Sequence, residues 1–197
     1  MSIALATGAL ALAGVSACGG GDATTAHEGT RGSAPATTTT AAAQPAETFD
    51  DADVMFAQMM IPHHEQAVEM AGLAPERAGD PEIKDLAAQI KAAQDPEIQT
   101  MKGWLAAWGR PTTAGHLGHD MPGLMSEEDM TELRSATGTA FDKLFARQMI
   151  AHHEGAIEMA RTEQAGGSDP RAKELARAIE RTQQAEVERL RDLLDRL

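Results

Sequence analysis

The sequence is poor in aromatic residues and in positive charge, and both shortages exclude classes of function. Aromatic residues make up 3% of the 197 residues, and tyrosine is absent. Tyrosine-based chemistry is therefore excluded, and an aromatic platform for nucleic-acid bases is disfavoured. The 17 lysines and arginines are outnumbered by 30 aspartates and glutamates, which gives a formal net charge of −13. Such a charge repels nucleic acid and anionic lipid headgroups, so we expect no nucleic-acid partner and a cationic ligand instead.

The chain also lacks the patterns that mark nucleophilic or phosphate-transfer catalysis. No serine or threonine lies in a recognisable nucleophile turn, and no glycine-rich phosphate loop precedes a helix. We therefore predict neither catalytic residues nor an organic cofactor, and we do not expect an enzyme. Methionine, in contrast, occurs 11 times.

The single cysteine, Cys18, follows an apolar run of small residues. Residues 15–18 read VSAC and look like a bacterial lipobox, in which the chain is cut before the cysteine and the cysteine sulfur then carries lipid. This predicts a signal peptide at residues 1–17 and a lipid-anchored protein on the extracytoplasmic face of the cell membrane. The predicted signal peptide holds no lysine or arginine, which is unusual, so an uncut apolar tail is the alternative. No other segment reaches the length that spans a bilayer.

The segment after the cysteine is rich in glycine, threonine, alanine and proline. Because it has almost no large apolar side chain, burial cannot offset the entropy that ordering it would cost. We predict a disordered tether over residues 18–49, followed by one folded domain over residues 50–197.

The predicted domain contains an internal duplication. Residues 53–108 align with residues 142–197 at a constant offset of 89 without a gap, and 21 of the 56 aligned residues are identical. Internal repeats of this kind indicate that one structural unit occurs twice. We therefore divide the domain into a first repeat (53–108), a linker (109–141) and a second repeat (142–197).

Each repeat has the hydrophobic spacing of a helical hairpin. Apolar residues and histidine recur at intervals of three and four, and glycine and proline then interrupt the pattern before a second striped segment. The Asp-Pro pairs at residues 80–81 and 169–170 are predicted to start the second helix of each hairpin. Two hairpins can cover their apolar stripes by packing about a pseudo-twofold axis. We predict an all-α, ferritin-like four-helix bundle with a long crossover linker, which contains a short helix starting at Ser126.

Two adjacent histidines occupy the first helix of each repeat, within QMMIPHHEQAVEM and RQMIAHHEGAIEM. In each half a methionine lies three residues before the first histidine and four before the second, so its side chain can approach both rings. A single histidine on an apolar stripe is more often a satisfied core residue than a ligand. Burying an imidazole without a partner costs on the order of 1–3 kcal/mol, yet both copies keep the two histidines and this methionine. The predicted metal ligands of this pattern are Met60, His63, His64, Met149, His152 and His153.

Additional candidate ligands lie beside the first pair and in the linker. Met59 precedes Met60, but its counterpart in the second repeat is Gln148. The glycine-rich segment GHLGHDMPGLM has no core pattern that explains its histidines and methionines. The additional candidates are Met59, His116, His119, Met121 and Met125. Four glutamates that also recur in both repeats are expected on a solvated face; these are Glu65, Glu69, Glu154 and Glu158.

A glutamine recurs in the apolar stripe of the second helix of each repeat. If the hairpin turn is centred near residue 76, His63 lies opposite Ile90 and Gln94 lies about one turn away. Gln183 has the same relation to His152. A buried amide needs a partner, so we predict that each glutamine bonds the second nitrogen of a ligating imidazole; a bond to the backbone or to water is the alternative.

The ligand types indicate which metal would be bound. Thioethers and neutral imidazoles favour copper, especially Cu(I), whereas magnesium, calcium and manganese prefer carboxylate and water. Zinc bound by the histidines alone, or iron, is the alternative. A di-iron carboxylate bundle requires Glu-x-x-His on two helices. Here the residues three positions before the histidines are methionine and isoleucine, so that signature is missing.

The segments DVMFAQMMIPHHEQAVEMA, MPGLMSEEDM and FDKLFARQMIAHHEGAIEMA closely resemble the bacterial domain-of-unknown-function family 305. The resemblance covers residues 50–197 and implies a ferritin-like four-helix bundle. Some family members are similar to extracytoplasmic copper-binding or copper-resistance proteins with Met and His ligands. This sequence departs from the family pattern in two respects. Gln148 stands in the second repeat where the first has Met59, and the linker contains few methionines. By position, the resemblance implicates Met60, His63, His64, Met70, Met149, His152, His153 and Met159.

The sequence therefore favours a lipid-anchored helical bundle that binds copper as a buffer or chaperone, not as a catalyst. The expected partners are a metal ion and, through the anchor, the membrane; a protein partner and a homo-oligomer stay open. One alternative is a structural or interaction lipoprotein whose Met/His stripe is only core. The other is a ferritin-like redox enzyme, which requires carboxylates such as Glu65 or Asp85 to face the histidines inside the bundle.

Overall fold

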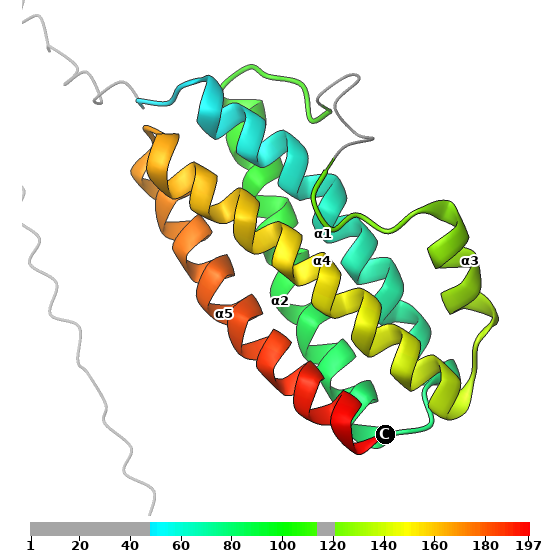
Figure 1. Cartoon of the computed structure of the whole chain (residues 1–197). Coiled ribbons are helices and arrows are strands. Elements are labelled where there is room, and N and C mark those ends of the chain that lie inside the picture. Colours follow the sequence, from blue (N-terminus) through cyan, green and yellow to red (C-terminus); the bar gives the residue numbers. More distant parts are fainter. Residues whose placement is uncertain (1–47, 114–120) are drawn as a thin grey trace, which may run out of the picture. The chain divides into compact units, whose positions relative to one another are not determined.

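The computed structural model describes residues 48–113 and 121–197, which form four long helices and one short helix (Figure 1). These residues contain no β-strand, and the predicted all-α four-helix bundle is confirmed. None of the described helices is long and apolar enough to cross a membrane. The helices are α1 (Asp51–Arg77), α2 (Pro81–Ala107), α3 (Glu127–Ser135), α4 (Gly138–Gly166) and α5 (Pro170–Arg196).

Several sequence predictions fall outside the described residues. The predicted signal peptide, Cys18 and nearly all of the predicted tether precede residue 48. His116 and His119 lie in the segment 114–120, which is likewise not described.

The starts of the helices follow from local sequence. Asp80 and Asp169 act as N-caps, with proline at the first helical position of α2 and α5, as predicted. Ser126 caps α3 as predicted, and its hydroxyl accepts a hydrogen bond from the Asp129 amide at 3.1 Å. The helix α4 begins at Gly138, so its first turn lies inside the range 109–141 assigned to the linker.

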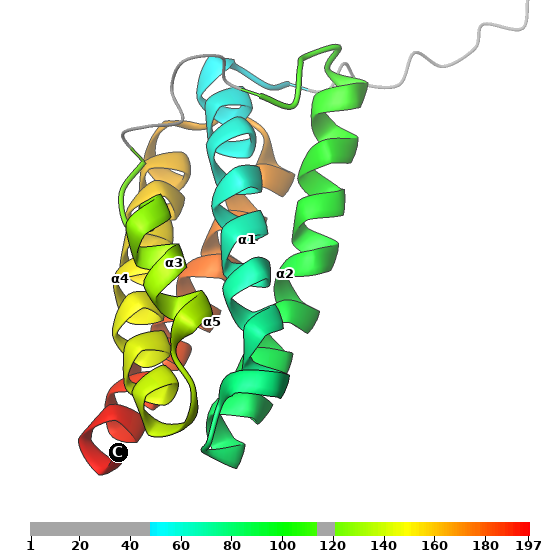
Figure 2. The ribbon, with the colours of Figure 1, turned by 90° about the vertical axis from the view of Figure 1, so that its right-hand side faces the viewer.

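Each repeat forms one hairpin, in which α1 packs against α2 and α4 packs against α5. The two hairpins meet mainly through α1 and α4. The short helix α3 lies beside these two helices in both views (Figures 1 and 2). The inner pair of helices, α1 and α4, therefore positions any site built from the duplicated histidines.

Two buried aspartates at equivalent positions attach the turn of each hairpin to the other hairpin. Asp142, the fifth residue of α4, accepts hydrogen bonds from the amides of residues 79–80, at 3.0 Å each. Asp53, in the first turn of α1, accepts hydrogen bonds from the amides of residues 168–169, at 3.1 and 2.9 Å. The start of each inner helix thus contacts the end of the other, so α1 and α4 run antiparallel about a pseudo-twofold axis.

The interior contains two clusters of buried side chains. Met70 and Met149 belong to one cluster, whereas Met60 and Met159 belong to the other. Each cluster therefore contains one of these four methionines from each repeat, as the pseudo-twofold axis requires. Because α1 and α4 are antiparallel, the histidines lie between these clusters along both helices.

The first hairpin turn lies further along the chain than the sequence predicted. Helix α1 continues through Gly72 and Pro75 to Arg77, and the turn is centred at Gly79 instead of near residue 76. The buried Ala74 extends the apolar stripe past the exposed Gly72, which favours continued helix despite the two helix-breaking residues. A turn displaced by three residues shifts the pairing of α1 with α2 by about six residues.

Candidate metal centre

The first histidine of each pair lies where α1 and α4 cross. The centroids of the His63 and His152 rings are 3.7 Å apart. His63, His64, His152 and His153 are all fully buried, with no exposed surface. The structure thus brings the predicted histidines of the two repeats together inside the bundle.

The linker supplies the hydrogen-bond partner of His63. Its Nε2 atom lies 3.0 Å from the carbonyl oxygen of Pro122. Because a carbonyl can only accept a hydrogen bond, Nε2 carries the proton and donates it. In the neutral ring the other nitrogen, Nδ1, is then unprotonated, and it has no hydrogen-bond partner among the described residues.

Two glutamates hold the second histidine of each pair. His64 Nε2 lies 2.9 Å from Glu97 Oε2, and His153 Nε2 lies 2.8 Å from Glu186 Oε2. Carboxylates oriented toward one imidazole nitrogen commonly fix the ring so that the opposite nitrogen can bind a metal. Here the opposite nitrogen, Nδ1, has no hydrogen-bond partner in either ring within the described parts of the chain.

The sequence analysis missed both glutamates, although a signal for them existed. Glu97 and Glu186 are identical residues at the offset of 89. They were overlooked because they lie on the partly exposed flank of α2 and α5, away from the apolar stripes.

Burial keeps the central rings neutral. It is the main cause of the lowering of the pKa of His63 to about 3, and the neighbouring His64 contributes to the same shift. Burial also holds the pKa of His152 well below its usual range, with His63 as the next cause. In addition, neither ring nitrogen of His152 has a hydrogen-bond partner among the described residues. These rings can therefore offer free lone pairs at neutral pH.

The hydrogen bond predicted from Gln94 to an imidazole is absent. Gln94 is buried, but neither its amide nitrogen nor its amide oxygen has a partner among the described residues, and the same holds for the amide oxygen of Gln183. The imidazole of His64 instead contacts Glu97, which lies three residues beyond Gln94 on α2.

The methionines predicted as ligands occupy different surroundings. Met60, Met70 and Met149 are fully buried, and Met159 keeps 7% of its surface exposed. Met59 packs at the edge of the cluster that contains Met60. The core of each half thus places one thioether within three residues of the first histidine along the same helix.

The linker methionines lie at both ends of the segment that contacts His63. Met121 is buried, and Met125 packs against the cluster that contains Met70 and Met149. Gln66 holds the backbone of Met125 through two hydrogen bonds, of 2.9 and 2.7 Å. This side chain fixes where the linker crosses the inner helices.

The carboxylates of the duplicated segments face solvent, as predicted. Glu65, Glu69, Glu154 and Glu158 are exposed, and so is Asp85 on α2. Glu65 and Glu154 form equivalent ion pairs, with Lys102 and Arg191 respectively, at 2.6 Å each. The inward-facing Glu65 or Asp85 that the redox-enzyme alternative requires is therefore not observed.

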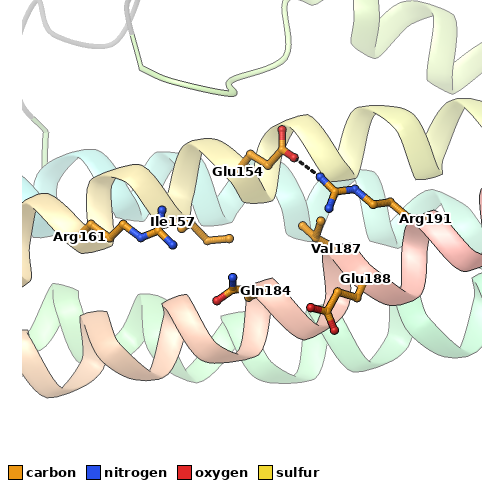
Figure 3. A pocket seen from close by; sticks show the side chains of 7 residues that line it. All are labelled: Glu154, Ile157, Arg161, Gln184, Val187, Glu188 and Arg191. Carbon is orange, nitrogen blue, oxygen red and sulfur yellow. Dashed lines mark hydrogen bonds and ion pairs between the residues drawn. The ribbon is translucent and has the colours of Figure 1, made fainter.

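The histidines and carboxylates do not form a metal site by themselves. Over residues 48–113 and 121–197, no three side chains of histidine, cysteine, aspartate or glutamate gather closely enough to hold an ion. A hollow of about 230 Å³ between α4 and α5 is lined by charged and polar side chains that include Glu154 and Arg191 (Figure 3). Neither imidazole nor thioether lines this hollow. The histidine pairs and their methionines remain the candidate site for a soft ion.

Comparisons with known proteins agree with this architecture. A DUF305 protein from Streptomyces coelicolor is 31% identical, with a TM-score of 0.70, and the match covers 74% of this chain and 93% of that one. A DUF305 fragment from Deinococcus radiodurans is 30% identical, with a TM-score of 0.70 and coverage of 76% and 99%. CopM in its Cu(II)-bound form is 36% identical, with a TM-score of 0.65 and coverage of 73% and 96%. Structures of CopM bound to Cu(I) and to Ag also match.

No curated protein sequence matches the chain. The family model described as "Domain of unknown function (DUF305)" matches residues 53–194, which include both histidine pairs and the linker between them. This chain therefore belongs to the DUF305 family, whose four-helix architecture it shares with a copper- and silver-binding protein.

Proposed function

We propose that this protein binds copper as Cu(I) where α1 and α4 cross, and that it acts as an extracytoplasmic copper buffer or chaperone. The observation that carries the proposal is a set of four buried imidazoles, each with an Nδ1 atom that has no partner among residues 48–113 and 121–197. A buried polar atom without a partner is costly, on the order of 1–3 kcal/mol. Ligation of an ion by these lone pairs would remove that cost.

The surroundings of the rings support ligation. The Pro122 carbonyl and the Glu97 and Glu186 carboxyl groups each contact an Nε2 atom, which leaves Nδ1 available. Neutral imidazoles and thioethers are soft to borderline ligands that suit Cu(I) better than magnesium or calcium. No three of the described histidine, cysteine, aspartate and glutamate side chains gather closely enough to hold an ion. The proposed site therefore combines the facing rings of His63 and His152 with the sulfur atoms of Met60 and Met149, and His64 and His153 adjoin it.

The relatives support a soft-metal role. CopM, which is 36% identical over 73% of this chain, was solved with Cu(I), Cu(II) and silver. In this proposal copper is cargo, so its binding needs no catalytic group. The lipobox-like residues 15–18 further suggest a lipid anchor at Cys18 and a location outside the cytoplasmic membrane.

An anaerobic titration of the full chain with Cu(I), Ag(I) and Zn(II) tests the proposal. The variant His63→Leu/His152→Leu removes the two rings that meet at the crossing. The matched control Gln94→Leu/Gln183→Leu removes two equally buried polar groups at equivalent positions of α2 and α5. Thermal unfolding of both variants shows whether the fold is retained.

We expect the histidine variant to lose at least about 100-fold in Cu(I) affinity, and the control to stay within about threefold of the unmodified chain. Tighter binding of Zn(II) than of Cu(I) would contradict the choice of metal. Unchanged Cu(I) binding in the folded histidine variant would overturn the site and favour the alternative in which the Met/His stripe is only core.

A further inference from the structure

A second group of methionines lines a hollow on the surface between α1 and α4. The hollow has a volume of about 240 Å³, and its walls include Met55 and Met59 from α1 and Met159 from α4. Met55 and Met59 are four residues apart, so they lie on the same face of α1. We call this hollow the methionine pocket.

Met55 is an apolar residue that is not packed in the core. It keeps 49% of its surface exposed, the larger value of the two exposed large apolar side chains in the described residues. A thioether is a weak hydrogen-bond acceptor but a good ligand for soft ions. The exposed Glu158 also lines the pocket and adds negative charge, which attracts cations.

The methionine pocket adjoins the buried histidines. Pro122 lines the pocket, and its carbonyl oxygen accepts the hydrogen bond from His63 Nε2 at 3.0 Å. Met159 lines the same pocket and belongs to the buried cluster that contains Met60. Because the four histidines have no exposed surface, an ion must cross a wall of the bundle to reach them. At the pocket, Pro122 both lines the hollow and contacts the His63 ring.

The pseudo-twofold axis does not generate a second pocket of this kind. The counterparts of Met55 and Met59 are Leu144 and Gln148, which lack a thioether. Helix α3 covers that position, where the Gln148 amide donates a hydrogen bond to the backbone oxygen of Asp129 at 3.1 Å. The duplicated core thus has thioethers at the surface on one side and a covering helix on the other.

We infer that the methionine pocket is a capture site for a monovalent soft ion, Cu(I) or Ag(I), from which the ion passes beside Pro122 to the histidines. This inference rests on the proposed function, because it gives the route by which the same cargo reaches the buried rings. The pocket is a binding site in its own right, with Met55, Met59 and Met159 as ligands.

The test measures how fast the full chain takes Cu(I) from a chromophoric Cu(I) chelator under anaerobic conditions. The variant Met55→Leu/Met59→Leu removes two sulfur atoms with little change in side-chain volume. The control Met101→Leu/Met130→Leu removes two buried sulfur atoms on α2 and α3, outside the pocket. Equilibrium affinity is measured for each variant with the same chelator.

We expect the pocket variant to take up Cu(I) at least about tenfold more slowly than the unmodified chain, because it lacks two of the three capture ligands. The control should match the unmodified chain in both uptake rate and equilibrium affinity. In the unmodified chain labelled with ¹³C at the methionine methyl groups, the Met55 and Met59 signals should shift at substoichiometric Ag(I).

Three outcomes distinguish the two proposals. Unchanged uptake in the pocket variant, or equal slowing in the control, would overturn the capture site and leave the proposed function intact. Methyl signals of Met55 and Met59 that do not respond to Ag(I) would do the same. If the unmodified chain takes up neither ion, both the proposed function and the capture site are wrong.

Discussion

At the scale of single residues, the buried histidines differ from ordinary core histidines in which of their two ring nitrogens have partners. His63 and His64 each have a hydrogen-bond partner at Nε2 and His153 Nε2 forms an ion pair with Glu186, whereas the Nδ1 atoms of these three rings have no partner among the described residues. A histidine selected only for packing would be expected to satisfy both nitrogens, since each buried orphan is costly. The one-sided arrangement is that of rings held for ligation.

The first prediction concerns the glutamates that hold two of these rings. The variant Glu97→Ala/Glu186→Ala should weaken Cu(I) binding by about 10- to 100-fold, because the His64 and His153 rings lose the partner that orients them. The affinity is measured by chelator competition.

The control is Glu65→Ala/Glu154→Ala. These glutamates are also equivalent by the duplication, but they form exposed ion pairs, and such pairs contribute little to stability. Equal affinities of the two variants would show that Glu97 and Glu186 have no part in binding.

At the scale of elements, the linker is the part that makes the two halves different. Pro122 and Gly123 lie directly against α4: a Cβ atom on Gly155 would be 2.0 Å from the Pro122 oxygen. Gly123 has a φ of 75°, a backbone conformation that residues with a Cβ atom rarely adopt. In the first repeat the counterpart of Gly155 is Gln66, which holds the linker at Met125. One repeat thus makes room for the linker, and the other binds it.

The second prediction is that Gly155→Ala lowers the free energy of unfolding by about 1–3 kcal/mol, because the added methyl group overlaps the linker backbone. The measurement is urea unfolding. The His63 ring signals in NMR should also change, because the displaced Pro122 carbonyl no longer accepts from Nε2.

The control for this variant is Gly103→Ala on α2, where a Cβ atom meets nothing within 4 Å. Alanine favours helix over glycine, so this change should be neutral or stabilising by up to about 1 kcal/mol. A Gly155→Ala variant as stable as this control would contradict the close approach of the linker.

At the scale of the whole molecule, the two buried aspartates join the hairpins at both ends, but the ends are not equivalent. Beside Asp53 lies Glu163, which is buried, whereas its counterpart in the first repeat is Ala74. Burial, followed by the neighbouring Asp53, raises the pKa of Glu163 to about 8. The folded protein therefore binds one more proton than the unfolded chain at this position between about pH 4.5 and pH 8.

The third prediction follows from the sign of this shift. The contribution of Glu163 to stability is fully present below its unfolded pKa of about 4.5 and is lost as the pH rises through about 8. The free energy of unfolding should thus decrease by on the order of 1–3 kcal/mol from pH 5 to pH 8 because of this residue.

Glu163→Gln should remove that part of the pH dependence, since glutamine does not titrate. The comparison is urea unfolding of both proteins at several pH values between 5 and 8, which cancels the contributions of all other groups. Parallel pH profiles of the two proteins would contradict the raised pKa.

Much of the architecture could be predicted from the sequence because it depends on local and repeated signals. The spacing of apolar residues indicated the long helices, the Asp-Pro pairs indicated where α2 and α5 begin, and the offset of 89 indicated the pseudo-twofold relation. The end of α1 was predicted less well, because Gly72 and Pro75 resemble a helix stop but are included in the helix. Packing of the apolar stripe, a tertiary effect, overrides their local preference.

By itself, the sequence determined that two equivalent helical hairpins each carry a histidine pair beside a methionine, because helical periodicity and duplication are properties of the chain alone. Only the tertiary structure decided which atoms those histidines meet: Pro122, Glu97 and Glu186 at Nε2, and the His152 ring against His63. It also decided that Met55, Met59 and Met159 line one pocket. The physical reason is that contacts between helices depend on where each turn lies and how the linker crosses, which the local periodicity of the chain does not determine.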